Sequence, residues 1–213
     1  MKTNRTLFFV LIANFGALSY LLQYFRIPLP FLFPSFLEIH FSNVPAIIGG
    51  FALGPLAGGL IVLIKFLLQV LFVPSYTGYI GEAIDLILGV ATVLVSSLVY
   101  QRIKSKKGAI TASLFGILTW VIVAVGINYL FAIDFYVGLL TYPGQDGLDA
   151  ILESSKVIPG INRSNYLSKI VFLGILPFNI LTSMLTYGIT FIIYKRVSSF
   201  IVHLNQRFSK ETE

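Results

Sequence analysis

The sequence contains no cysteine, and only 11% of its residues are charged. Without cysteine the chain has no disulfide framework, no thiolate metal site and no cysteine nucleophile. Its two histidines, His40 and His203, belong to no HExxH motif, and no P-loop is present to hydrolyse ATP. Nothing singles out a Ser–His–Asp set. We therefore expect a protein that is not an enzyme and that holds no metal or resident cofactor.

Apolar residues dominate the composition. They make up 56% of the 213 residues, and the mean hydropathy is +0.87. This is typical of a protein that crosses a lipid bilayer several times. The net charge of +6 does not indicate a nucleic-acid partner, because most basic residues gather at the ends of apolar runs, where they act as topology signals. These clusters are Lys2 and Arg5; Arg102, Lys104, Lys106 and Lys107; and Lys195, Arg196, Arg207 and Lys210.

The apolar runs predict one all-α membrane domain over residues 1–213, a bundle of six transmembrane helices. The expected spans are residues 7–25, 44–54, 57–74, 82–101, 109–132 and 168–194. A turn at the GPLAG sequence separates the second span from the third. The second span is too short to cross a ~30 Å bilayer alone, so we expect it to be tilted, buried or extended. Six crossings and the basic clusters predict that both termini lie inside.

Two segments outside the spans have distinctive compositions. Residues 26–43 hold three prolines among alternating Phe and Leu, so they cannot form one continuous helix, yet they are too apolar for a solvated loop. We expect them to form a cap across the outer mouth of the bundle. Residues 133–167 carry acidic and turn residues and predict a long outer loop, the fifth, with a short helix near 147–156.

Polar residues in the last span recur with helical spacing. They are Asn179, Thr182, Ser183, Thr186, Tyr187 and Thr190, which fall on one face of a helix. Polar groups within a bilayer need partners, so this stripe must face other helices or a cavity. A contact between helices, which Ser and Thr often make, and a ligand pocket both explain the stripe.

Charged residues lie within or next to the spans. Lys65 falls inside the third span, and Glu82 and Asp85 open the fourth, three residues apart. A helix N-terminus favours acidic residues, so one interpretation is that Glu82 and Asp85 cap the helix while Lys65 pairs with one of them or reaches toward the interface. The other interpretation is that Lys65 and Glu82 contact a ligand, because a charge at this depth is costly without a role.

Aromatic residues gather toward the predicted outer side, among them Phe36, Phe41, Tyr76 and Tyr79. An interfacial aromatic belt explains some of them. Many lie in loops, however, and an aromatic lid would suit a flat ring. Asn128 is the strongly polar residue of the fifth span, and its amide both donates and accepts. With Asn179 it forms a plausible two-amide site beneath the lid.

Several of these stretches resemble the substrate-binding (S) components of energy-coupling factor (ECF) vitamin transporters, most closely the riboflavin type. The similar stretches are FSNVPAIIGGFALGPLAG at 41–58, LIK at 63–65 and LPFN at 176–179. Ala13 and Ala17, four residues apart, occupy the place where S components carry the small-residue pair that meets the coupling subunit. Such spacing permits close backbone approach between helices.

The resemblance implies a multi-pass protein of a bacterial-type cell membrane that binds a vitamin with high affinity and has no ATPase. Its partners would be a transmembrane coupling subunit and two ATP-binding subunits. In riboflavin-type members amides matching Asn128 and Asn179 hold the ring. Here His40 replaces a frequent acidic residue, and Thr182 replaces a frequent ligand-facing lysine. Pantothenate or another small B vitamin is therefore an alternative substrate.

Two other classes of protein fit the sequence less well than an S component does. An autonomous secondary transporter would normally show internal repeats and matching broken helices, and the sequence shows neither. A purely structural subunit would not need Asn128 and the Asn179 stripe facing a lid. An S component explains the bundle, the polar stripe, the aromatic lid and the absence of any motif for energy coupling.

Overall fold

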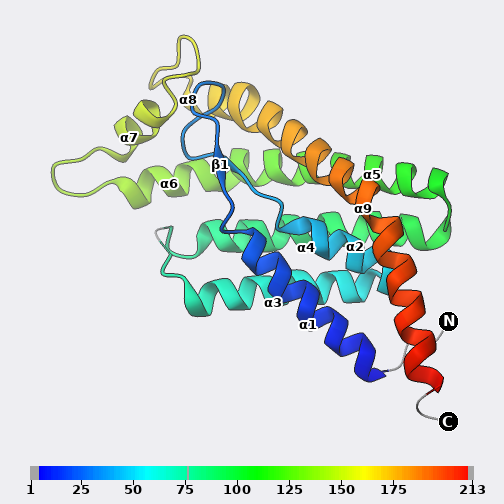
Figure 1. The fold of residues 1–213 in the computed structure, drawn as a ribbon. Coiled ribbons are helices and arrows are strands. Elements are labelled where there is room, and N and C mark those ends of the chain that lie inside the picture. The colour runs from blue at the N-terminus through cyan, green and yellow to red at the C-terminus, as the bar shows by residue number, and fades with distance from the viewer. Residues whose placement is uncertain (1–4, 76, 211–213) are drawn as a thin grey trace.

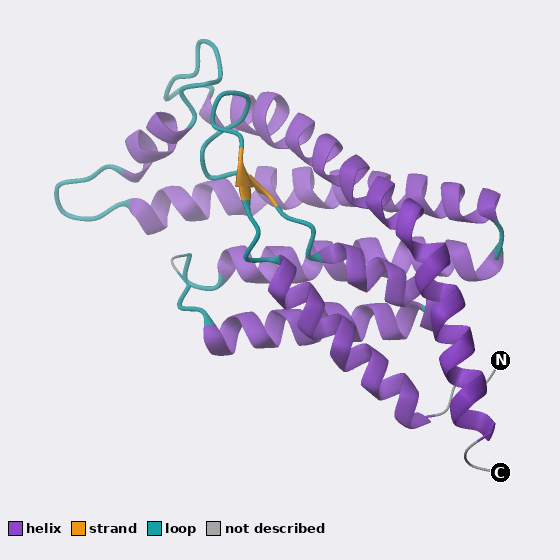
Figure 2. Cartoon of the chain, in the orientation of Figure 1, coloured by secondary structure: helices purple, strands orange, loops and turns teal. Residues whose placement is uncertain are grey.

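The computed structural model describes residues 5–75 and 77–210 as a bundle of long helices with one small two-stranded sheet (Figures 1 and 2). The elements are α1 (Arg5–Leu22), β1 (Ile27–Pro28), β2 (Glu38–Ile39), α2 (Asn43–Leu53), α3 (Pro55–Phe72), α4 (Ile80–Arg102), α5 (Lys106–Ile127), η1 (Asn128–Ala132), α6 (Ile133–Leu140), α7 (Gly147–Ser154), α8 (Tyr166–Lys169), η2 (Ile170–Ile175) and α9 (Leu176–Lys210).

Five helical elements of the described residues are long and apolar enough to cross a membrane. They are Arg5–Leu22, Pro55–Phe72, Ile80–Arg102, Lys106–Leu140 and Tyr166–Val197. Each matches one predicted span to within a few residues at its start. The sixth predicted span is α2, which has only 11 residues and so extends about 16 Å at 1.5 Å per residue. By length, therefore, five spans are found where six were predicted.

The short helix α2 lies inside the bundle rather than spanning it, which is one of the three arrangements expected for it. All residues from Asn43 to Phe51 are buried. Gly54, at φ 110°, ends α2 in a conformation that favours glycine, and Pro55 begins α3. A Cβ atom on Gly58 would lie 2.9 Å from the Cα of Gly50. The small residues therefore allow α2 and α3 to pack backbone to backbone.

The fifth span continues beyond its predicted end. Residues 133–140 were expected to belong to the outer loop, but they form α6, which continues the helix from α5 through η1. The sequence IDFYVGLL contains no proline, and Pro143 and Gly144 come only after Leu140, so the helix ends there. The short helix expected near 147–156 is present as α7. Arg163 holds this loop together by donating to Asp146 and Asp149 at 2.6 and 2.7 Å.

Residues 23–42 form the cap, which lies over one end of the bundle beside α8 and the start of α9 (Figure 1). We call this the capped end. Ile27 and Pro28 pair antiparallel with Ile39 and Glu38, so the predicted all-α fold needs this small addition. Between the strands Phe33 packs edge-on against Phe178 of α9, with ring centroids 5.4 Å apart. The apolar alternation of the cap therefore anchors it to the bundle.

Both described termini, the start of α1 and the end of α9, lie at the end of the molecule opposite α7 and α8 (Figure 1). The helix α9 runs from the capped end past α5 and α2 and packs against both. The loop between α4 and α5, with its basic residues, also lies away from the cap (Figure 1). This arrangement agrees with the termini and basic loop sharing one side of a membrane; which side it is stays a prediction.

The polar stripe of the last span faces the interior of the bundle, and Tyr187 contacts two neighbouring helices. Every predicted member is buried. Tyr187 Oη donates to the backbone oxygen of Thr92 on α4 at 3.4 Å, and a Cβ atom on Gly116 of α5 would lie 1.9 Å from Tyr187 Oη. At Tyr187 the structure therefore supports the helix-contact interpretation. Asn179 and Thr182 lie nearer the cap.

Candidate functional site

A cavity of about 230 Å³ lies at the capped end, between the cap and the ends of α1, α3, α4 and α6. We call it the cap pocket. Most of its lining is polar or charged, although it adjoins an apolar bundle. The lining residues are Gln23, Arg26, Phe36, Glu38, His40, Gln69, Thr77, Gly81, Glu82, Asp85 and Tyr136. They come from segments far apart in the sequence, so only the folded bundle assembles the pocket.

The cap contributes to the pocket through its alternating side chains. Glu38 and His40 line the cavity, whereas Ile39 between them is 4% exposed and packs with Phe33 and Phe178. Successive side chains of an extended segment point to opposite sides. The strand β2 thus holds the cap onto α9 with one face and presents polar groups to the pocket with the other.

Beneath the pocket lies a buried ion pair. Lys65 of α3 is 1% exposed, and its Nζ donates to Asp85 Oδ2 at 2.7 Å, to Asn43 Oδ1 at 2.9 Å and to Ser42 Oγ at 3.2 Å. An ammonium group has three N–H donors, so all of them are used. Lys65 therefore joins α3 to α4 and to the start of α2. Of the two sequence interpretations, the structure supports pairing, with Asp85 as the partner.

The same network reaches His40. The Oγ of Ser42, which accepts from Lys65, lies 2.9 Å from His40 Nδ1. Burial lowers the pKa of His40 from 6.5 to about 4, with Asp85 opposing the shift and Lys65 and Arg26 reinforcing it. The imidazole is therefore neutral at pH 7. Because Lys65 donates to Ser42, the hydroxyl hydrogen is free to point at Nδ1, an arrangement that favours the N–H on Nε2.

The carboxylates of the pocket are mostly neutralised. Arg26 Nη1 lies 3.3 Å from Glu38 Oε2, and Asp85 is paired with Lys65. Glu82 accepts from Ser75 Oγ at 2.9 Å and Thr77 Oγ1 at 3.0 Å, and it has no ion-pair partner in residues 5–75 and 77–210. Glu82 thus holds the turn that precedes α4 through two side-chain hydroxyls rather than through a backbone N–H of the helix, while it also lines the pocket. The site favours an uncharged ligand rich in hydrogen-bonding groups.

A second polar feature of the capped end is Asn179 near the start of α9. It is 7% exposed, and its Oδ1 accepts from the indole Nε1 of Trp120 on α5 at 2.9 Å. Its Nδ2 donates to the backbone oxygen of Ile175 at 2.8 Å. Each of these bonds identifies one end of the amide, because an indole N–H only donates and a carbonyl only accepts. One N–H of Asn179 is left to meet a further acceptor.

Asn128 lies on the same face of the fifth span as Trp120. Residues 120, 124 and 128 are spaced by four, and Asn128 Nδ2 donates to the Ala124 backbone oxygen at 2.8 Å. Asn128 opens the π-helical segment η1, which contacts the π-helical segment η2 of the last span. Such segments often occur at functional sites. The two asparagines thus lie on two spans that pack together, and each amide is bonded to its own helix.

The other predicted site residues are distributed around this region. Phe36 lines the cap pocket together with Glu82. Phe41 is partly buried and packs beside Phe178. Tyr79 is 45% exposed in a left-handed conformation, φ 67°, and does not line the pocket, and Tyr76 lies outside the described residues. Thr182 is buried, and its Oγ1 has no hydrogen-bond partner in the described part of the chain.

Among the contributors to the site that were not predicted are Gln23, Arg26, Gln69 and Trp120. The first three lie at or just beyond helix ends, where isolated polar residues are common, so they carry no periodic signal. Trp120 falls in an apolar run, but its spacing of eight residues from Asn128 marks it as sharing a face with that residue. Among the described residues no three His, Asp or Glu side chains gather closely enough to hold a metal ion.

Comparison with known proteins places this geometry in context. A family model described as "ECF transporter, substrate-specific component" matches residues 7–194. The chain is 26% identical over 201 residues to the riboflavin transporter RibU of Staphylococcus aureus (strain TCH60), covering 94% of each chain. It is 28% identical over 193 residues to the riboflavin transporter FmnP of Bacillus subtilis (strain 168), covering 90% of this chain and 92% of the relative.

A solved structure shows the same fold. It is that of the S component of a bacterial ECF transporter, and it superposes with a TM-score of 0.68 at 25% identity. The alignment covers 93% of this chain and 99% of the other. The similarity therefore extends over nearly the whole chain.

Proposed function

The chain belongs to the family of ECF transporter substrate-specific components, and on this basis we propose that it binds riboflavin at the capped end and delivers it for import. The observation that carries the proposal is similarity to two riboflavin transporters along nearly the whole chain. As a transporter S component the chain is not an enzyme, and ATP hydrolysis belongs to partner subunits.

The chemistry of the capped end supports a flavin. An isoalloxazine ring has apolar faces and an edge of alternating donors and acceptors, while its ribityl chain carries hydroxyl groups. Asn128 and Asn179 each have amide capacity left over after their bonds to their own helices. The cap pocket, with Phe36 and Tyr136 beside paired charges, offers an aromatic surface together with many hydrogen-bonding groups. Together the two amides and the cap pocket offer contacts for both the isoalloxazine ring and the ribityl chain.

The surface of α1 supports the proposed assembly with a transmembrane coupling subunit. Ala13 and Ala17 are exposed on one face of α1, four residues apart, while Gly16 between them is buried against Ile64 of α3. Small exposed residues let a partner helix approach closely. We propose that the coupling subunit packs on this face and that two ATP-binding subunits complete the transporter in the cell membrane.

The direct test is the absorption and fluorescence spectrum of the purified protein. We expect flavin bands, or their appearance when riboflavin is added, with quenching of flavin fluorescence on binding. A colourless protein that does not bind riboflavin but binds radiolabelled pantothenate would instead assign the site to pantothenate. Reconstitution alone in liposomes separates the transporter classes, because an S component without its ATP-binding partners should not concentrate solute.

A further inference from the structure

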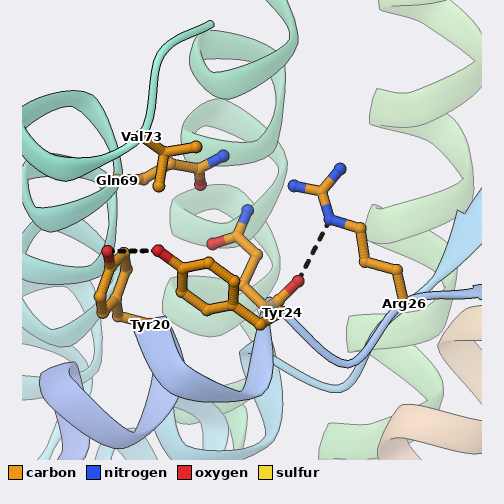
Figure 3. A pocket seen from close by; sticks show the side chains of 6 residues that line it. Tyr20, Tyr24, Arg26, Gln69 and Val73 are labelled. Carbon is orange, nitrogen blue, oxygen red and sulfur yellow. Dashed lines mark hydrogen bonds between the residues drawn. The ribbon is translucent and has the colours of Figure 1, made fainter.

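A second, smaller cavity of about 30 Å³ lies between the C-terminal ends of α1 and α3, next to the cap pocket. Figure 3 shows Tyr20 and Tyr24 on one side of it, Gln69 and Val73 opposite, and Arg26 at its edge. Gln23, Arg26 and Gln69 line both cavities, so the two adjoin each other at these three side chains. The small cavity is thus a neighbour of the cap pocket on the side of α1 and α3.

Two buried carboxamides line this small cavity. Gln23 is 6% exposed, and its Nε2 donates to Asp85 Oδ2 at 3.3 Å, which turns its Oε1 away from Asp85. That Oε1 is buried and has no hydrogen-bond partner in the described chain. Gln69 is also 6% exposed, and no hydrogen bond from its side chain to another described residue is present. A buried acceptor without a donor is unfavourable, so the cavity calls for a hydroxyl or another donor.

The charges next to the cavity select against an ionic group. The Arg26 side chain bonds to the Gln23 backbone oxygen at 3.2 Å and pairs with Glu38, while Asp85 is paired with Lys65. Among the described residues that line the two cavities, no cation is left unpaired to neutralise a carboxylate or phosphate. Tyr20 and Tyr24 bond to each other through their hydroxyls at 2.5 Å. A cavity of this size holds a hydroxyl-bearing carbon or a water molecule, which needs at least about 10–15 Å³.

We propose that Gln23 and Gln69 form a seat for a hydroxyl group of the polyol chain of the transported ligand. This inference rests on the proposed function and adds to it a division of the site. The ring is recognised on the side of Tyr136, Asn128 and Asn179, and the polyol extends between α1 and α3. Gln23 accepts a hydrogen bond from a ligand hydroxyl, and Gln69, free of protein partners, both donates and accepts.

The test compares riboflavin with lumiflavin, which has the same ring but a methyl group in place of the ribityl chain. Gln69→Leu is the first variant, because Gln69 bonds to no described residue and its loss leaves no protein group unpaired. Gln23→Leu is the second. We expect each to weaken riboflavin binding about tenfold, the effect of roughly one hydrogen bond, and to leave lumiflavin affinity unchanged. Gln101→Leu, whose side chain bonds to Phe51 away from the cap, is the matched control.

Each other outcome overturns the seat. Equal weakening of both flavins by Gln69→Leu would mean a general effect on the bundle, and unchanged riboflavin affinity in both variants would mean that the cavity holds only water. Wild-type protein that binds the two flavins equally well would show that the polyol is not recognised, while the proposed function stands. Wild-type protein that binds neither flavin would overturn the proposed function and the seat together.

Discussion

The indole Nε1 of Trp120 donates to Oδ1 of Asn179 at 2.9 Å, across the contact between α5 and α9. Trp120 is the single tryptophan of the chain and is 3% exposed. Because the indole can only donate, the bond fixes which end of the Asn179 amide faces α5. The amide is then presented to the capped end in one orientation, with an N–H free. Trp120 is therefore a positioning residue for the proposed ligand contact.

Replacing Trp120 by Phe keeps an aromatic ring but removes the donor, so the Asn179 amide keeps only its bond to Ile175 and is held less firmly in its orientation. We expect Trp120→Phe to weaken riboflavin binding about five- to tenfold, near the value of one hydrogen bond. If Trp120 acts through Asn179, the same change made in an Asn179→Leu background should have no further effect. Dissociation constants for the four proteins, from flavin fluorescence, check this. Additive losses would assign Trp120 to packing alone.

The Lys65–Asp85 pair predicts a loss of stability when one partner is removed. Lys65→Met leaves Asp85, which is 17% exposed, without its cation, and we expect the free energy of unfolding to fall by about 3 kcal/mol. Lys65→Met combined with Asp85→Asn should recover much of the loss. Thermal unfolding in detergent measures both. Lys156→Met, which breaks an exposed pair with Glu153, is the control and should leave the midpoint nearly unchanged. An equally small effect of Lys65→Met would contradict the structure.

The exposed face of α1 predicts a separation of binding from transport. Ala13→Trp and Ala17→Trp place bulk on the surface proposed to meet the coupling subunit, so vitamin uptake by the whole transporter should be abolished while riboflavin affinity is retained. Gly16→Ala is the contrasting variant, because its Cβ would lie 2.5 Å from Ile64 Cγ2 and should lower the unfolding midpoint. Loss of riboflavin binding in the Trp variants would show that the face is internal packing.

Burial of His40 predicts a dependence of stability on pH. Its pKa of about 4 in the folded protein lies below the ordinary value of 6.5, so the unfolded chain binds the proton more tightly. Stability should be unaffected above pH 7 and should fall as the pH drops from 6.5 toward 4. Unfolding midpoints of the wild type and of His40→Gln at pH 7.5, 6.0 and 5.0 measure this dependence. The midpoint of the variant should decline less with falling pH than that of the wild type. Parallel declines would remove His40 as the cause.

The sequence predicted the helices well because their signals are local. Runs of apolar residues, the Gly54–Pro55 break and the spacing of the Asn179 stripe each follow from residues close together in the chain. The predicted end of the fifth span was wrong because an aspartate such as Asp134 is more typical of a loop than of a membrane span. In the structure its carboxylate accepts a hydrogen bond from Tyr166 Oη at 2.7 Å, a contact between residues 32 positions apart.

The site was only partly predictable because it depends on long-range pairing. That Lys65 would pair with a carboxylate was one expectation, but the choice of Asp85 over Glu82 depends on how α3 packs on α4. The lid aromatics were chosen by composition, which cannot tell Phe36, in the pocket lining, from Tyr79, which is not. Gln23 and Gln69 come together only when the ends of α1 and α3 do.

Titration of riboflavin into the purified protein and into the Asn128→Leu, Asn179→Leu and double variants tests the central claim most directly. The wild type should quench flavin fluorescence saturably, each single variant should bind at least about tenfold more weakly, and the double variant weaker still, with unfolding midpoints that show the variants to be folded. A wild type that does not bind riboflavin, or folded variants that bind it as tightly as the wild type does, would contradict the account.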